Sequence, residues 1–207
     1  MMRTGTGRIR TILVGTALVG AAVVPVTGAG ASVTSGAACP ERELAPTFAP
    51  FLDPNSYFAL PGGDFEHGTG DWSLRGGARV EGGINQTLLD VAGGGDDSHA
   101  LVLPAGSSAR AATLCVSGTA PVMRFFVATK GLLGALAVTV TATDEAGDTQ
   151  VLVTPALSIL PGWTAPMVLF RLPWLGDHLT QVTIELRSVG WSPVVVDDIY
   201  VDPLRQR

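Results

Sequence analysis

The fold is decided by the stretch Ala137-Val138-Thr139-Val140-Thr141-Ala142-Thr143. Its apolar residues alternate with threonines, which is the pattern of a β-strand with one face in a core and the other toward solvent. The next residues, Asp144-Glu145-Ala146-Gly147-Asp148, have the composition of a hairpin turn, and the chain returns over residues 149–154. The stretch therefore predicts an antiparallel β-hairpin.

Similar short segments recur along the chain. In residues 181–189, Val182, Ile184 and Leu186 alternate with polar residues. Further strands are predicted at residues 72–80, 86–91, 99–103, 109–116, 121–128, 157–159, 167–171 and 194–201. A helical period is not sustained anywhere after the leader, although residues 132–137 could hold one helical turn. About ten short strands between glycine-rich turns predict one all-β domain, either a two-sheet sandwich or a barrel.

The first 31 residues have the organisation of a secretory signal peptide. Arg3, Arg8 and Arg10 are the only charged residues before Glu41, and an apolar run of about 13 residues follows them. Small residues then offer a cleavage site after Ala31. We therefore expect a secreted, extracellular protein.

Two alternatives to a cleaved leader remain open. A retained transmembrane anchor would need about 20 apolar residues, more than the leader has, so we expect no stable membrane span after cleavage. A lipoprotein would carry its lipid on Cys39, but Gly36 stands where a lipobox has an aliphatic residue.

Residues 32–61 predict a flexible lead-in followed by an extended arm. Prolines forbid a regular helix or a central strand there, and aromatic side chains between them are expected to dock on the domain. These residues are Pro46, Phe48, Pro50, Phe51, Pro54, Tyr57, Phe58 and Pro61. The chain thus divides into a signal peptide (1–31), an arm (32–61) and a β-domain (62–207).

Charge excludes some partners. Cleavage removes three arginines and no acids, which leaves ten basic against eighteen acidic residues and moves the net charge from −5 to −8. Nucleic acid is therefore not an expected partner, because phosphate contacts need clustered lysine and arginine. The same net charge disfavours an anionic membrane surface.

The chain contains two cysteines, Cys39 and Cys115. An even number in an oxidising compartment favours a disulfide, which would tie the arm to the domain. Two free or modified thiols are the alternative. A redox-active pair would need a Cys-x-x-Cys spacing, which the chain lacks.

Catalytic motifs are missing from the sequence. It has no nucleophile elbow, zinc-protease motif, Walker loop or dinucleotide-binding glycine motif. His67, His99 and His178 are far apart and have no metal-spaced partner. We therefore expect a protein that is not an enzyme.

The last predicted strand contains two adjacent acids, Asp197 and Asp198, in Val194-Val195-Val196-Asp197-Asp198-Ile199-Tyr200-Val201. Apolar residues fill both phases of the strand, so unbroken alternation turns one of the two acids toward the core. A buried carboxylate must be hydrogen-bonded, paired or metal-bound. The acid could accept hydrogen bonds from backbone N–H groups or an arginine, or it could be a Ca²⁺ ligand.

Three motifs resemble the start, middle and end of a galactose-binding-like β-jelly roll. They are Gly62-Gly63-Asp64-Phe65-Glu66 followed by Trp72, then Asp97-Ser98-His99-Ala100-Leu101-Val102-Leu103, and finally Val196-Asp197-Asp198-Ile199-Tyr200-Val201. Carbohydrate-binding modules of the CBM4/9/22 type have this order. The resemblance covers residues 62–203 and implies a two-sheet antiparallel jelly-roll sandwich, a fold rather than an activity. The arm from Cys39 to Pro54 is similar to that of exported actinobacterial proteins.

The resemblance also implies two binding sites. A structural Ca²⁺ would join the first strand to the last, with Asp64, Glu66 and Asp197 or Asp198 as ligands and backbone carbonyls near Asp97. A sugar would stack on exposed tryptophans, for which Trp163, Trp174 and Trp191 are the candidates because each follows or lies in a turn. We expect Trp72 in the core.

Three functions remain as hypotheses. The first is an exported non-catalytic binding module, with carbohydrate as its ligand. The second is a structural or protein-interaction domain at the cell surface, indicated by the threonine-rich strand faces and the apolar residues 132–136. The third is an exported hydrolase, which would need two facing carboxylates ~5–10 Å apart in a cleft.

Overall fold

The computed structural model describes residues 39–84, 86, 97–117, 122–154, 156–171 and 179–202. The predicted signal peptide lies outside these residues. In the described part, regular structure is β-strand apart from the 3-10 turn η1 (Ala49–Phe51). No helix in the described residues is long and apolar enough to cross a membrane. The prediction of an all-β domain is confirmed.

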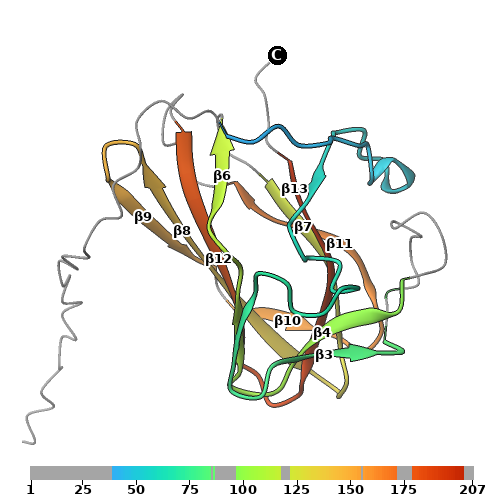
Figure 1. The fold of residues 1–207 in the computed structure, drawn as a ribbon. Coiled ribbons are helices and arrows are strands. Elements are labelled where there is room, and N and C mark those ends of the chain that lie inside the picture. The colour runs from blue at the N-terminus through green and yellow to red at the C-terminus, as the bar shows by residue number, and fades with distance from the viewer. Residues whose placement is uncertain are drawn as a thin grey trace, which may run out of the picture. The chain divides into compact units, whose positions relative to one another are not determined.

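The strands form two antiparallel sheets (Figure 1). Sheet 1 has the order β11 (Thr164–Arg171), β7 (Val122–Thr129), β13 (Val194–Asp202), β4 (His99–Leu103) and β3 (Arg79–Gly82), with β1 (Phe58–Ala59) also paired to β13. Sheet 2 has the order β10 (Leu157–Ile159), β8 (Gly134–Asp144), β12 (Leu179–Ser188), β5 (Ser108–Arg110) and β2 (Ser73–Arg75). In sheet 2, β9 (Thr149–Val153) pairs with β8, and β6 (Leu114–Ser117) pairs with β12. This is the two-sheet antiparallel sandwich that the resemblance implies.

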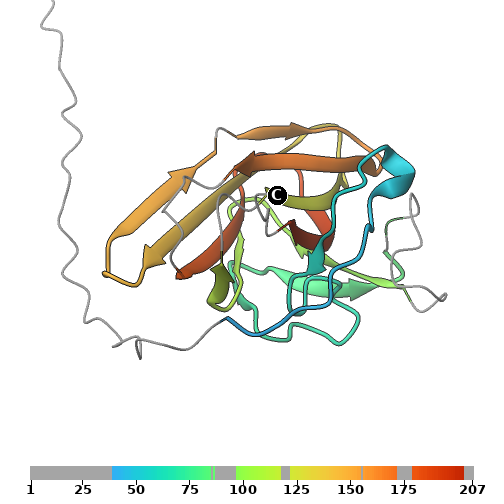
Figure 2. The same ribbon diagram turned by 90° about the horizontal axis from the view of Figure 1, so that it is seen from above.

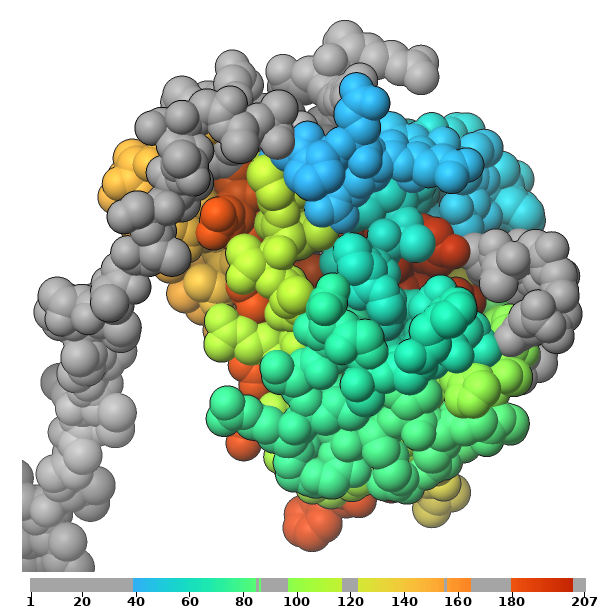
Figure 3. Space-filling view, in the orientation of Figure 1, coloured from blue at the N-terminus to red at the C-terminus, as the bar shows by residue number. Residues whose placement is uncertain are grey.

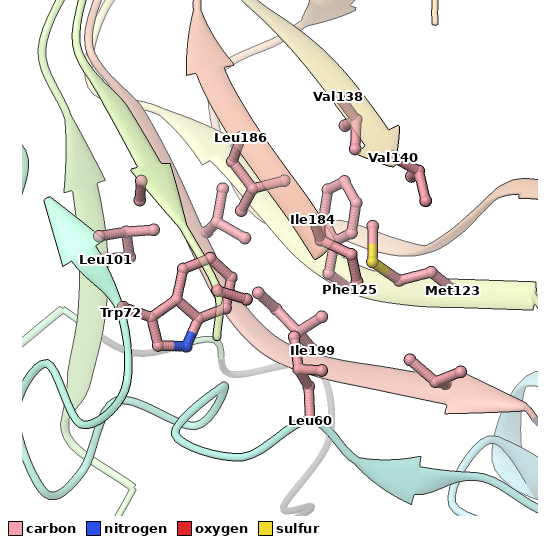
Figure 4. Packing of buried hydrophobic residues seen from close by; sticks show 14 of the residues in the cluster. Leu60, Trp72, Leu101, Met123, Phe125, Val138, Val140, Ile184, Leu186 and Ile199 are labelled. Carbon is pink, nitrogen blue, oxygen red and sulfur yellow. The ribbon is translucent and has the colours of Figure 1, made fainter. Parts of the chain in front are cut away.

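The core lies between the two sheets because each strand turns its apolar face inward. Along β8, buried and half-buried residues alternate as the sequence predicts, with Leu136, Val138 and Val140 inside. Figure 4 shows Val138 and Val140 on the side of β8 that faces the other sheet, where Met123 and Phe125 project from β7. Trp72 belongs to the same cluster, as predicted, and is 5% exposed.

Two strand predictions and the predicted helical turn need correction. Residues 72–80 form two strands, β2 and β3, in different sheets, because Gly76 and Gly77 take left-handed conformations (φ 67° and 85°) where the chain crosses between sheets. Residues 109–116 are divided between β5 and β6. Residues 132–137 contain no helical turn, since β8 begins at Gly134. Of the strand predicted at 86–91, residues 87–91 lie outside the described part.

The disulfide prediction is confirmed by a Cys39–Cys115 bond, with the two Cα atoms 5.4 Å apart. This bond fixes the beginning of the arm to β6 of sheet 2. Figures 1 and 2 show the arm, coloured from blue to cyan, running from there across the domain to η1. On the way, the Arg42 guanidinium stacks 4.4 Å from the centre of the Phe58 ring.

The arm then covers part of the outer face of sheet 1. Phe48 and Tyr57 are buried against Phe126 of β7, and the Tyr57 hydroxyl donates a hydrogen bond to Asp53 (2.6 Å). Arg124 pairs with Asp53 and lies over both aromatic rings of the arm. The arm therefore occupies a sheet face that would otherwise be open to a ligand.

Candidate functional site

A β-bulge in β13 shapes the acidic site. The core cluster contains Val194, Val196, Ile199 and Val201, so two residues rather than one separate Val196 from Ile199. The pairing of β13 with β7 shifts register between Asp197 and Tyr200, and Asp198 has a φ of 50°. An extra residue in one strand of an antiparallel pair is the definition of a bulge.

This bulge overturns the expectation that one of the two aspartates turns into the core. That expectation assumed unbroken alternation along the strand. With the extra residue, the apolar residues directly before and after the two acids, Val196 and Ile199, both face the core. Both acids instead gather beside residue 97, at a distant point of the chain.

Carboxylate oxygens of Asp97, Asp197 and Asp198 lie within 4.8 Å of one another. Asp197 is fully buried, Asp198 is 3% exposed and Asp97 is half-buried. We call these three residues the carboxylate cluster. Its members come from β13 and from the segment that leads into β4, which is the strand next to β13 in sheet 1.

Gln86 connects the members of the cluster. It is 1% exposed, and its side-chain amide donates to Asp198 (2.9 Å) and to Asp97 (3.4 Å). Its backbone N–H donates to Asp197 (3.2 Å), which also accepts the backbone N–H of Asp198 (2.9 Å). Gln86 therefore supplies some of the hydrogen bonds that these carboxylates would otherwise receive from water.

These hydrogen bonds do not remove the electrostatic cost of the cluster. Burial, together with the neighbouring Asp198, raises the pKa of Asp197 to about 9. Burial, together with the neighbouring Asp97, raises the pKa of Asp198 to about 7. Like charges in a desolvated site favour uptake of a proton or a cation. Carboxylates are the hard oxygen ligands that Ca²⁺ prefers, so the chemistry of this donor set fits a divalent cation.

Glu66 lies beside the cluster and holds the start of β4. One of its carboxylate oxygens accepts the backbone N–H groups of Ser98 (2.9 Å) and His99 (2.6 Å). The other accepts the Ser98 hydroxyl (3.2 Å) and lies 3.0 Å from His99 Nδ1. Burial opposes ionisation of Glu66, but these hydrogen bonds, His99 first, hold its pKa below the ordinary value. Glu66 therefore has four contacts within the protein.

Asp64 is half-buried and close enough for its charge to raise the pKa of Asp198. Between Asp64 and Glu66, the buried Phe65 has a φ of 56°, which a non-glycine residue adopts at a cost. The four predicted ligands thus lie in one neighbourhood, and Asp197 and Asp198 are in the cluster itself. The sequence suggested only the backbone near Asp97, whereas the structure contributes its carboxylate.

The predicted sugar-binding tryptophans occupy different environments. Trp163 is half-buried and packs on the outer face of sheet 1, against Ala128 and Phe126 with their neighbours. Trp174 lies outside the described residues. Trp191, in the turn before β13, is 98% exposed. Of the described tryptophans, Trp191 is thus the one that presents its ring to solvent.

The turn that carries Trp191 is firmly attached to the sandwich. The backbone N–H groups of Val189 and Gly190 both donate to the carbonyl of Ala135 (2.8 and 3.3 Å). A Cβ on Gly190 would lie 2.6 Å from the Ala135 nitrogen, so only glycine fits this close approach. Ser192 forms a bridge with Gly134 on the other side of the turn. Trp191 is therefore an exposed ring on a rigid support.

No protein-family model matches the chain, and no curated protein matches it. Among solved structures, it is similar to the CBM22-1–GH10 modules of Clostridium thermocellum xylanase 10B in complex with xylohexaose. That match has 14% identity and a TM-score of 0.46, and covers 70% of this chain but only 27% of that one.

A second similar structure is the module TmCBM61 in complex with β-1,4-galactotriose, with 13% identity and a TM-score of 0.42 over 72% of this chain and 98% of that one. A third is the enzymatically active domain of bacteriophage CBA120 tailspike protein 4, with 12% identity and a TM-score of 0.45. The match covers 69% of this chain and 21% of that one. At these identities the likeness is one of fold alone.

Proposed function

We propose that this protein is an exported, non-catalytic module that binds carbohydrate, with Trp191 as its principal stacking platform. The observation that carries the proposal is the 98% exposed indole on a turn held by two backbone hydrogen bonds. The C–H faces of a sugar ring stack on an aromatic face, and the indole N–H can donate to a sugar hydroxyl.

The position of the carboxylates supports a non-catalytic role. A general acid or base must reach the proton that it transfers. Asp197 and Asp198 are buried and Asp97 is half-buried, and Gln86 contacts all three. This arrangement suits a structural cation better than a pair of acids facing a substrate.

The extracellular setting has independent support from the Cys39–Cys115 disulfide. Disulfides persist in oxidising compartments and are rare in the cytosol. The leader at residues 1–31 has the organisation of an export signal, although it lies outside the described residues.

The carbohydrate proposal is tested by replacing Trp191. We expect Trp191→Ala to weaken binding to insoluble polysaccharide by about five- to thirtyfold, since stacking on one aromatic ring contributes about 1–2 kcal/mol. Trp191→Phe should retain part of the affinity. Trp163→Phe is the matched control, because the Trp163 ring is half-buried. Absence of glycan binding by the wild type, or equal binding by Trp191→Ala, would refute the proposal.

We also propose that the carboxylate cluster holds a structural Ca²⁺. Ca²⁺ should raise the melting temperature relative to EGTA, because a cation bound only to the folded state stabilises it by about 2.7 kcal/mol at a hundred times its dissociation constant. Asp198→Asn should melt higher than the wild type in EGTA, since it removes one buried charge, and should no longer respond to Ca²⁺. A wild-type melting curve that ignores both Ca²⁺ and EGTA would exclude the site.

A protein-interaction role is the second candidate, favoured by one observation on sheet 2. Val151 and Val153 of β9 are each 60% exposed and lie opposite Thr141 and Thr139 of β8 on the outer face. An exposed strand of this kind can pair with another chain. Chemical crosslinking and light scattering of wild type and Val151→Lys would test it, and a strictly monomeric wild type without crosslinked partners would count against it.

A further inference from the structure

Three loops form an exposed apolar surface at one end of the sandwich, which we call the tip. The loops follow β7 (residues 130–133), follow β10 (160–163) and precede β13 (189–193). Their exposed apolar side chains are Leu132 (90%), Leu133 (52%), Leu160 (61%), Val189 (47%) and Trp191 (98%). Single exposed apolar residues are common, but a contiguous group usually marks an interaction site.

Backbone contacts make the tip one surface. The Lys130 N–H donates to the carbonyl of Pro193 (3.1 Å), which joins the first loop to the third. Thr129, the last residue of β7, forms a bridge with Pro161, which places the second loop beside the start of the first. Figure 1 shows the loops after β7 and before β13 at the foot of the sandwich, and Figure 3 shows the segment before β13 (orange-red) projecting from its lower rim.

Basic side chains surround the tip. Lys130 lies in the first loop and Arg187 two residues before Val189. Arg75 and Arg187 are both exposed, and both pair in register with Ser108, one from each side. Arg79 and Lys130 each pair with Glu81, so that acid is flanked by two cations.

The opposite end of sheet 2 is acidic. The β8–β9 turn contains Asp144, Glu145 and Asp148, and β8 is 11 residues long, which separates the turn from the tip by about 35 Å. Cys115, Gln181 and Thr143 are in register across β6, β12 and β8. The disulfide therefore brings the start of the arm, with Glu41 and Glu43, to the same acidic end.

We propose that the tip docks on the surface of an anionic lipid bilayer. Tryptophan and leucine at the apex would enter the boundary between headgroups and acyl chains, to a depth of about 5–10 Å. The basic residues set behind them would then lie at the level of the lipid phosphates. A projecting apolar apex suits a deformable lipid phase, whereas a rigid protein partner would need a matching pocket.

The position of the charges matters more here than the net charge of the chain. A uniformly acidic chain is repelled by an anionic surface, but here the acids of the β8–β9 turn and of the start of the arm lie at the end of sheet 2 away from the tip, and Glu81, near the tip, is paired with Arg79 and Lys130. The charge separation would orient the domain, with its basic end toward the phosphates and its acidic end away. Glu185, half-buried beside Arg110, is the next acid behind Arg187 on the outer face of sheet 2.

Vesicle co-sedimentation tests the proposal, with full-length, disulfide-intact protein and identical N-termini in all variants. The wild type should bind vesicles containing 30% phosphatidylglycerol at least about tenfold more tightly than pure phosphatidylcholine, since each basic residue near an anionic surface contributes about fivefold. The double variant Lys130→Glu/Arg187→Glu should lose that preference. Leu132→Asp should lose about tenfold in binding, whereas Val151→Asp, at an exposed apolar site (60%) on β9 away from the tip, should not.

Other outcomes contradict the proposal. It fails if the wild type binds neither vesicle, if neutral and anionic vesicles bind alike, or if Val151→Asp is as damaging as Leu132→Asp. The result is separable from the carbohydrate proposal although both use Trp191, because the vesicles contain no sugar. Lys130→Glu/Arg187→Glu should leave polysaccharide binding within twofold of the wild type, so either proposal can fail alone.

Discussion

The carboxylate cluster and the tip violate the usual distribution of residues in opposite ways. At the cluster, two acidic side chains, Asp197 and Asp198, are 0% and 3% exposed. At the tip, Trp191 and Leu132 are 98% and 90% exposed. Burying acids and exposing large apolar side chains both work against folding.

The two regions differ in the contacts that the rest of the protein makes with these side chains. The cluster depends on an internal partner, Gln86, whose backbone and side chain both donate to it. The tip has no covering partner within the described chain, and backbone contacts only hold its loops in place. This difference agrees with the two proposals, a structural cation at the cluster and an external ligand at the tip.

Gln86→Ala should produce the largest change, because it removes the amide donor from a buried group of acids. We expect a loss of about 2–4 kcal/mol in the free energy of unfolding, measured by urea denaturation. Gln150→Ala, an exposed amide on β9, is the matched control and should change stability by less than about 0.5 kcal/mol. Equal effects of the two substitutions would show that Gln86 does not support the cluster.

Gly190→Ala should have an intermediate effect at the other region. Its Cβ would lie 2.6 Å from a backbone nitrogen of Ala135, so the turn below Trp191 must shift at a cost of about 1–3 kcal/mol. Gly82→Ala is the control, since there the nearest atoms belong to the His99 ring. Thermal unfolding would compare them, and an unchanged Gly190→Ala protein would mean that the turn is not rigid.

Leu132→Ser should have the smallest effect on stability. The side chain is 90% exposed, so the free energy of unfolding should change by less than about 0.5 kcal/mol. The same substitution in the core, Leu136→Ser, should cost at least about 3 kcal/mol and provides the contrast. A large loss of stability in Leu132→Ser would place this loop in the core rather than in a binding surface.

Much of the fold could be predicted from short-range patterns. The alternation in residues 137–143 predicted β8, and residues 99–103 and 157–159 coincide with β4 and β10. The predictions failed where glycine pairs redirect the chain, as at Gly76 and Gly77, because a crossing between sheets leaves the apolar pattern unchanged. They also failed at the bulge. An extra residue in β13 changes which side chains face the core, and the prediction had assumed strict alternation.

The candidate site was less predictable. Asp197 and Asp198 were identifiable because acids in an apolar strand need partners. Gln86 was not, since it is separated from Asp197 by 111 positions and stands in no motif. Trp191 could not be distinguished from Trp163 by local sequence, because both lie in turns.

The sequence by itself determined the strand periodicity, the antiparallel hairpin and the two cysteines available for pairing, since these depend on neighbouring residues and composition. Only the tertiary structure decided which strands share a sheet, that a bulge gathers three acids, and that one tryptophan is exposed while another is buried. The physical reason is that backbone conformation is set largely by local preferences, whereas burial and electrostatic environment are set by residues distant in the chain.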